Sequence, residues 1–364
     1  MGIPRAARAA VLEAPGEISI RTLAVPEIGS DEALLKVGLI GVCGTDVGYF
    51  TGHLAVPLPT ILGHEIFGTL EAIGARAADR YQLAPGQRVL VDASIPCWTC
   101  SPCRSGEYRF CSRKREYGSK VPISVFPGLW GGMADFMYVA PGSILRAVPD
   151  ALSAEGAIAA ALAANAFEWL VGEGGALIGD QIVIQGAGPQ GLAAAAVASA
   201  MGARNVIVTG LARDAARLQF ALAVGGRHAL VVDGDDIVER VRLLTGGEGA
   251  DVVLDVTGSA SALSTSIEMV RPKGRVVLAG LAGREARVSI TPDHLVWNHI
   301  RIQGVYVKGD TAWTKALQFM VDQGSAYPLD RIVSHVFPLE QSGAAIMAGR
   351  DSNLDGFVKA AIRP

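Results

Sequence analysis

The distribution of hydrophobic and polar positions divides the chain into two parts. Residues 1 to about 155 contain short apolar runs broken by Gly and Pro, such as 33–40 and 87–91, and these runs predict β-strands. From about residue 156, apolar runs rich in β-branched residues alternate with alanine-rich runs typical of helices. Strands that are apolar on both faces and alternate with helices predict a parallel, doubly wound sheet. The expected fold class is therefore α/β, with a β-rich domain followed by a doubly wound domain.

The alternation of the second part continues to about residue 303. Its predicted strands are 181–184, 205–209, 251–255 and 274–279, and its predicted helices are 190–201 and 214–224. A chain of 364 residues is too long for one ordinary core, which also favours two domains.

The C-terminal tail carries a predicted helix at 313–321 and a predicted strand at 332–338. The tail is too short to build a core of its own, so we expect it to pack on the first domain. The predicted domains are thus 1–158 together with 304–364, and 159–303.

The composition limits the classes of partner. A net charge of −3 and a pI near 6.1 do not attract nucleic acid or an anionic membrane. Residues 181–203 carry no charge and are long enough to cross a bilayer, but their Gly, Pro and Ala content predicts a buried strand–turn–helix instead. The N-terminus shows no apolar secretory segment, and clustered cysteines suit a reducing compartment, so we expect a cytoplasmic protein.

A glycine loop follows the first strand of the second domain. The residues Gly186, Gly188 and Gly191 give G-x-G-x-x-G, with Pro189 and Gln190 between the last two glycines. Because the motif lies between a predicted strand and a predicted helix, its backbone N–H groups can bind a pyrophosphate at the helix N-terminus. The sequence therefore predicts a dinucleotide site.

The next strand, 205–209, indicates which dinucleotide is bound. An acidic residue at its end accepts from the ribose 2′-hydroxyl of NAD and repels a 2′-phosphate. Here the strand ends at Gly210, and Arg213 follows within reach of a phosphate. This favours NADP slightly over NAD, and both remain open.

Four of the five cysteines form a closely spaced group. Their pattern, C-x2-C-x2-C-x7-C, is that of a closed structural zinc site. A ferredoxin-like iron–sulfur run is the alternative, and the last spacing fits it poorly. The predicted ligands are Cys97, Cys100, Cys103 and Cys111. The nearby cations, which can offset the thiolate charge, are Arg104, Arg109, Arg113, Lys114 and Arg115.

The fifth cysteine, Cys43, precedes a His-Glu pair, His64 and Glu65. Cys43 and His64 are the predicted ligands of a second, open zinc site, where the metal polarises a carbonyl or lowers the pKa of an alcohol. Asp46 can orient His64 through its second ring nitrogen, and Thr45 can carry a proton away from the site.

At this point the chain resembles the zinc-dependent alcohol dehydrogenase branch of the medium-chain dehydrogenase/reductase family, over nearly its whole length. Sorbitol- and threonine-dehydrogenase-like members look closest in the first motif. The matching motifs are residues 41–46, 63–65, 97–111, 131–135 and 186–191.

The resemblance implies a GroES-like catalytic domain, a Rossmann domain, and hydride transfer between NAD(P) and an alcohol or carbonyl in the cleft between them. It also implies further cofactor contacts at Thr257, Gly258, Gly280, Leu281, Val305 and Tyr306. By the same resemblance, the substrate pocket is expected near Tyr49, Phe50 and Trp130, with Trp98 and Trp297 as further candidates. These aromatic walls suit a bulky apolar substrate.

Two departures from the family concern the open zinc site. The third ligand of relatives aligns with Ala160, and no side chain from 157 to 164 binds metal. Gly48 replaces the histidine that ends the proton relay in many relatives, with His53 nearby in sequence. Either Glu65 completes the zinc site, with Asn165 or a water as weaker candidates, or the site holds no metal.

The leading hypothesis is an NAD(P)-dependent alcohol dehydrogenase or ketoreductase assisted by zinc. The alternative is a metal-independent reductase of an activated double bond or iminium that retains only the structural zinc. A third hypothesis, a non-enzymatic zinc ribbon, conflicts with the acidic pI and the intact glycine loop. The family also implies a homodimer or homotetramer acting on a small molecule.

Overall fold

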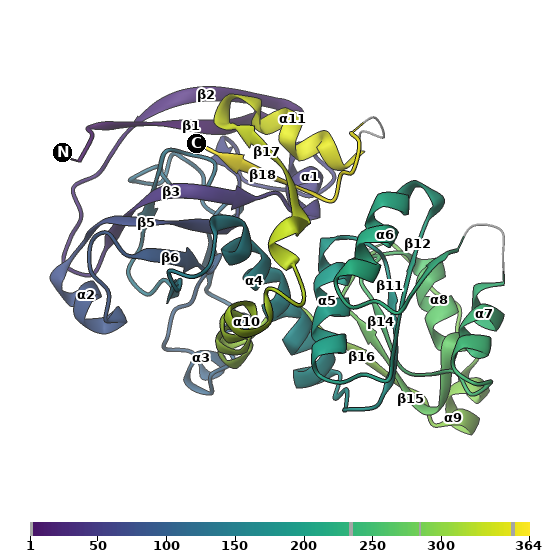
Figure 1. Cartoon of the computed structure of the whole chain (residues 1–364). Helices are drawn as coiled ribbons and strands as arrows, with labels where there is room; N and C mark the ends of the chain where they lie inside the picture. The colour runs from purple at the N-terminus through teal and green to yellow at the C-terminus, as the bar shows by residue number, and fades with distance from the viewer. Residues whose placement is uncertain (1–2, 233–235, 284, 351–353) are drawn as a thin grey trace. The chain divides into compact units, whose positions relative to one another are not determined.

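The computed structural model describes residues 3–232, 236–283, 285–350 and 354–364. These residues separate into two units, each shown in Figure 1. The first comprises the described chain up to Ile158 together with Val333–Pro364, and the second is Ala159–Ile332. The first boundary falls at the predicted position, whereas the chain returns to the first unit 29 residues after the predicted residue 304 (333 − 304 = 29).

The tail is divided between the two units, which corrects the expectation that all of it packs on the first. Its helix, α10 (Asp310–Gln323), buries Trp313, Ala316 and Phe319 within the second unit. The Phe319 ring meets Phe167 edge-on, with centroids 5.7 Å apart. Phe319 of α10 is thus covered by a residue of its own unit, and the part of the tail that joins the first unit begins at Val333.

The first unit is rich in strands, as the short apolar runs predict, and its strands pair antiparallel except for β17 and β18, which are parallel. A three-stranded sheet has the order β2-β1-β4, a seven-stranded sheet has the order β10-β6-β5-β3-β18-β17 with β9 also paired to β3, and β7 pairs with β8. These strands are β1 (Ala6–Ala14), β2 (Glu17–Ala24), β3 (Ala33–Gly41), β4 (Thr60–Ile61), β5 (Glu65–Ile73), β6 (Arg88–Val91), β7 (Ser94–Ile95), β8 (Arg115–Glu116), β9 (Phe136–Val139), β10 (Leu145–Ala147), β17 (Val333–Pro338) and β18 (Lys359–Arg363).

The core of the first unit lies between these sheets. Leu12, Leu35, Ile40, Ile66 and Leu70 are fully buried in one hydrophobic cluster. The unit's helical segments are α1 (Gly44–Phe50), α2 (Ala75–Tyr81), α3 (Ser101–Arg104), η1 (Tyr108–Phe110), η5 (Leu339–Gln341), α11 (Ser342–Met347) and η6 (Ala348–Arg350).

The second unit is a six-stranded, all-parallel sheet with the order β13-β12-β11-β14-β15-β16. The order reverses beside β11, so the first strand lies at the centre, and this confirms the predicted doubly wound sheet. In Figure 1, α5 and α6 cover one face and α7 and α8 the other. The strands are β11 (Gln181–Gln185), β12 (Asn205–Gly210), β13 (His228–Val231), β14 (Ala250–Asp255), β15 (Val270–Leu278) and β16 (Arg301–Gly304).

The central strands are buried on both faces, as their continuous apolar runs predict. Val183, Ile207, Val253 and Val276 have no exposed surface. The other helical segments are α4 (Ala154–Ala166), η2 (Phe167–Glu173), α5 (Pro189–Ala200), η3 (Ala212–Asp214), α6 (Ala215–Ala223), α7 (Ile237–Leu244), α8 (Ala260–Met269), α9 (Pro292–Asn298) and η4 (Leu329–Ile332).

The uncharged stretch 181–203 forms strand β11 and helix α5, as the sequence predicts. A different segment, Ala154–Glu173, is the one helical stretch among the described residues that is long and apolar enough to span a membrane. Most of it is buried inside the protein, which is typical of a core helix.

Candidate active site and metal centres

The four-cysteine loop forms a compact thiol cluster. The sulfur atoms of Cys97, Cys100, Cys103 and Cys111 all lie within 4.8 Å of one another. The Cys100 and Cys103 sulfurs are 3.4 Å apart, and those of Cys97 and Cys103 are 4.0 Å apart. Tetrahedral zinc–sulfur bonds of about 2.3 Å place sulfurs about 3.8 Å apart, so this donor set fits a single zinc ion.

The hydrogen bonds of the loop favour the thiolate form of Cys97. The N–H and hydroxyl of Thr99 lower the pKa of Cys97 to about 5, while burial and the neighbouring thiols raise that of Cys103 to about 12. Arg113 donates to the Cys97 sulfur at 3.4 Å. Of the other predicted cations, Arg109 pairs with Glu107, Lys114 with Glu116, and Arg115 lies over the Trp130 ring.

Cys43 lies where strand β3 passes into helix α1. Its backbone N–H donates to Asp46 Oδ2 at 2.9 Å, and this contact fixes the first turn of the helix. Its sulfur lies 3.7 Å from the Thr45 hydroxyl. The helix start thus places a thiol, a hydroxyl and a carboxylate together, as the sequence predicts for Cys43, Thr45 and Asp46.

His64 enters the same site from the start of strand β5. Its Nδ1 lies 3.3 Å from Oδ1 of Asp46, whose side chain is completely buried. Burial acts to lower the pKa of His64, but the charge and hydrogen bond of Asp46 raise it well above its usual value. Burial likewise acts to raise the pKa of Cys43, and the hydrogen bond and charge of His64 bring it below its usual value.

This arrangement fits a metal at Cys43 and His64. Asp46 engages Nδ1, so Nε2 is the ring nitrogen available as a ligand beside the thiolate. Asp46 Oδ1, which contacts His64 Nδ1, and Glu65 Oε2 are both buried oxygens beside this pair of ligands. Glu65, however, forms an ion pair with Lys359, 2.8 Å from its Oε2. Glu65 as a third ligand therefore stays a prediction.

The structure also places the residues at which the chain departs from its family's zinc-ligand and proton-relay positions. Ala160 is fully buried, and the Asn165 side-chain oxygen accepts from the backbone N–H of Lys308 at 3.3 Å. A Cβ at Gly48 would lie 2.7 Å from the Leu54 Cδ1 atom, so a larger residue there would require the exposed Leu54 side chain to move. His53 is exposed.

Trp130 is not a pocket wall, which corrects that prediction. It is 2% exposed, packs against Tyr117 and Tyr138, and donates its indole N–H to Val125 O at 2.8 Å. The other predicted walls lie nearer the surface. Tyr49 and Phe50 are partly buried, whereas Trp98, which lies within the four-cysteine loop, and Trp297 are exposed.

The glycine loop of the second unit has the geometry of a phosphate cradle. Gly186 follows β11 with φ +109°, and Pro189 opens α5 after the N-cap Gly188. A Cβ at Gly191 would lie 1.9 Å from Gly186 O, so only glycine fits there. Gln190 Oε1 is buried and has no hydrogen-bond partner among the described residues, which leaves it available to a ligand.

The predicted ribose end of the site lies after strand β12. Gly210 ends β12, and a Cβ there would meet Ala187 and Leu218 at 3.2 Å. Arg213 lies exposed in η3. Asp214 is turned inward, because it accepts from Leu211 N and pairs with Arg217.

The remaining predicted cofactor residues gather at the carboxyl ends of the sheet, where doubly wound folds bind ligands. Thr257 and Gly258 follow β14, and the Thr257 N–H and hydroxyl both donate to the buried carboxylate of Asp255. The backbone of Gly280 lies so close to that of Gly258 that a Cβ at Gly280 would lie 2.2 Å from Gly258 N. The other three, which are Leu281, Val305 and Tyr306, follow β15 and β16.

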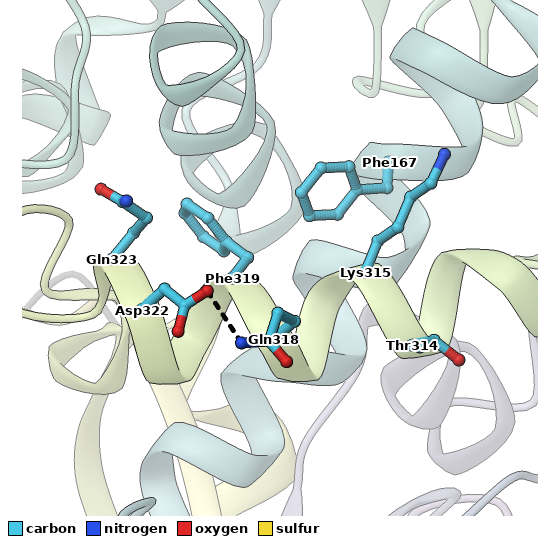
Figure 2. Close-up of a pocket in the computed structure, with 7 residues that line it drawn as sticks. All are labelled: Phe167, Thr314, Lys315, Gln318, Phe319, Asp322 and Gln323. Atoms are coloured by element: carbon cyan, nitrogen blue, oxygen red, sulfur yellow. Dashed lines mark hydrogen bonds between the residues drawn. The ribbon is translucent and has the colours of Figure 1, made fainter.

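Figure 2 shows a cavity elsewhere in the second unit, of about 430 Å³. It lies along α10 and contains none of the predicted site residues. Its lining is Phe167, Thr314, Lys315, Gln318, Phe319, Asp322 and Gln323.

Sequence reasoning missed Lys359. This lysine lies at the start of β18 with 2% of its side chain exposed, and it contacts both Glu65 and the carbonyl of Val42. No motif marks it, since only the pairing of β18 with β3 and of β3 with β5 brings residue 359 to Glu65.

Comparison with known proteins identifies the family of the chain. Residues 29–150 match the model of the alcohol dehydrogenase GroES-like domain, and residues 189–322 match that of the zinc-binding dehydrogenase family. A probable alcohol dehydrogenase of Mycobacterium tuberculosis is 39% identical over 94% of both chains. The sorbitol dehydrogenase of Bacillus subtilis is 30% identical over the same shares.

Solved structures show the same fold. A zinc-binding dehydrogenase of Sinorhizobium meliloti, bound to NADP, aligns with a TM-score of 0.86 and 27% identity over 99% of both chains. These findings confirm the predicted GroES-like and Rossmann domains and an NAD(P)-dependent oxidoreductase of alcohols. They do not favour the reductase alternative. The chain belongs to the zinc-type alcohol dehydrogenase branch of the medium-chain dehydrogenase/reductase family.

Proposed function

We propose that this dehydrogenase binds a second zinc at Cys43 and His64 and uses it to interconvert an alcohol and its ketone or aldehyde. The observation that supports this is the Asp46–His64–Cys43 arrangement. A fully buried carboxylate holds Nδ1 of the imidazole, and the ring lies beside a thiol whose pKa is lowered. An imidazole oriented in this way is typical of a metal ligand.

The chain's own residues have distinct roles in this reaction. The zinc, when bound, supplies Lewis acidity toward the substrate oxygen. Asp46 keeps the proton of His64 on Nδ1, so that Nε2 faces the metal. The Thr45 hydroxyl, beside the Cys43 sulfur, is the group placed to accept the alcohol proton and pass it outward.

The proposed cofactor is NADP rather than NAD. Gly210 provides no carboxylate to repel a 2′-phosphate, and Arg213 is exposed beside it. The S. meliloti relative is bound to NADP. We expect Arg213→Ala to raise KM for NADP about tenfold and to leave KM for NAD nearly unchanged. Equal changes for both cofactors would contradict the proposed role of Arg213.

The proposed substrate is bulky and apolar. Helix α1 begins immediately after Cys43 and carries Tyr49 and Phe50, with exposed Leu54 next to Gly48. A series of secondary alcohols of increasing ring size tests this proposal. Rising kcat/KM with size is the expected result, and a preference for small polyols would contradict it.

The proposed assembly is a homodimer that pairs two copies of β16. All four residues of this edge strand are exposed, and it pairs with β15 along one side only. Val296 and Trp297, just before it, are 68% and 78% exposed. Light scattering of Trp297→Glu is expected to show monomers, and an unchanged dimer would exclude this edge. With five cysteines that form no disulfide, the proposed location is the cytoplasm.

The first experiment is elemental analysis of zinc per subunit in the wild type and in Cys43→Ala. Two zinc ions in the wild type and one in the variant would support the proposal. One zinc in both proteins would favour the metal-independent alternative. A parallel screen of ketones against enones then distinguishes the two reactions.

A further inference from the structure

Lys359 is the least expected charged group near the proposed zinc site. Lysine is rarely buried, yet this side chain is 2% exposed. Its Nζ lies 2.8 Å from Glu65 Oε2 and donates to Val42 O at 2.7 Å. Val42 directly precedes Cys43, and Glu65 directly follows His64. One ammonium therefore contacts both segments that carry the proposed ligands.

The strands hold this ammonium in a fixed position. Strand β18 pairs with β3, and Val42 N donates to Ala360 O at 3.0 Å. Gly41 lies opposite Glu65 in the sheet, and a Cβ at Gly41 would lie 2.1 Å from Glu65 Oε2. The carboxylate therefore extends across the bare backbone of Gly41 to reach Lys359.

Glu65 pairs with Lys359 and lies outside any compact set of ligand atoms with Cys43 and His64. Among the residues that the structure describes, the four-cysteine group is the one set of three or more donors whose ligand atoms all lie within 4.8 Å of one another. Glu65 does not form such a set with Cys43 and His64. The Glu65 carboxylate is largely buried, and the Lys359 ammonium, 2.8 Å from its Oε2, is the group that compensates its charge.

We propose that Lys359 is a positioning residue that withholds Glu65 from the metal at Cys43 and His64 and so determines the ligand number of that site. This inference rests on the proposed function, because it needs a metal at those two residues. A buried carboxylate requires a compensating cation. Lys359 supplies one, and without it the metal is the nearest alternative.

The test compares the wild type, Lys359→Met, Glu65→Gln and the double variant, with Lys359→Arg and Cys43→Ala as controls. The open site is emptied with a mild chelator that leaves the four-cysteine zinc, and Co²⁺ is then titrated. Affinity and visible absorption report the ligands, and thermal unfolding with and without Co²⁺ reports stability.

We expect Lys359→Met to bind Co²⁺ at least about tenfold more tightly than the double variant, with a changed absorption spectrum. Its melting temperature without metal should fall, and Co²⁺ should restore it. Lys359→Arg, which retains the cation, should behave like the wild type.

A loss of stability in Lys359→Met with no change in Co²⁺ affinity or spectrum would show a merely structural ion pair and overturn the inference. If Lys359→Met does not fold, the spectrum of Glu65→Gln decides. An unchanged spectrum supports the inference, and a changed one shows that Glu65 already binds the metal. The proposed zinc site itself would be overturned if none of these proteins bound Co²⁺. It would also be overturned if the Co²⁺ binding of the wild type were unchanged in Cys43→Ala.

Discussion

The two proposed metal sites of this enzyme are built in opposite ways. The four-cysteine loop takes all its ligands from residues 97–111, and their sulfurs already lie within 4.8 Å of one another. The other site takes Cys43 from the end of β3, His64 from the start of β5, and its charge balance from Lys359 on β18. A local site depends on its own spacing, whereas an assembled site depends on strand register.

The largest expected effect comes from opening the local site. Cys103→Ala removes a buried ligand, so the loop should lose its zinc and the variant should melt well below the wild type, because structural zinc contributes about 10 kcal/mol or more to folding. Cys43→Ala is the matched control and should lose one zinc with little change in melting temperature. Similar melting temperatures for the two variants would contradict the expectation that the four-cysteine site, and not the Cys43–His64 site, stabilises the fold.

The assembled site should affect activity rather than folding. His64→Ala is expected to lower kcat/KM by about 10³ or more, equivalent to about 4 kcal/mol, because the proposed zinc loses one of its two protein ligands. Steady-state kinetics with an alcohol and with its ketone measure this. An active His64→Ala enzyme with one zinc per subunit would show that the reaction needs no metal at this position.

Asp46→Asn should produce an intermediate effect. The carboxylate accepts from Cys43 N with one oxygen and contacts His64 Nδ1 with the other, and an amide can accept at only one of these places. Zinc affinity at the open site is expected to fall about 10- to 100-fold, as measured by competition with a chelator. Unchanged affinity would mean that Asp46 supports the helix start and not the ligand.

Arg113→Ala should have the smallest effect. Its guanidinium donates to Cys97 Sγ and to the Thr99 hydroxyl, but the side chain is exposed, so its contribution is expected to stay below about 1 kcal/mol. The rate of zinc release to a chelator should rise slightly. Arg104→Ala, at an exposed position of the same loop, is the control and should leave that rate unchanged.

The sequence predictions were accurate for features within one continuous segment and less accurate for features that depend on packing between segments. The glycine loop and the four-cysteine group are continuous segments, and their geometry in the structure is the one that their spacing predicts. Trp130 was misplaced, because an aromatic residue beside a family motif can equally well fill the core. Helix α10 was assigned to the wrong unit, since its apolar face does not indicate which surface covers it.

The sequence by itself determined the two domains, the dinucleotide loop and the four-cysteine cluster. Each of these depends on local spacing or on a periodic pattern of apolar residues. Only the tertiary structure brought His64 beside Cys43 and placed Lys359 against Glu65. Contacts of this kind depend on strand register and on side-chain packing between segments, which no local pattern in the sequence encodes.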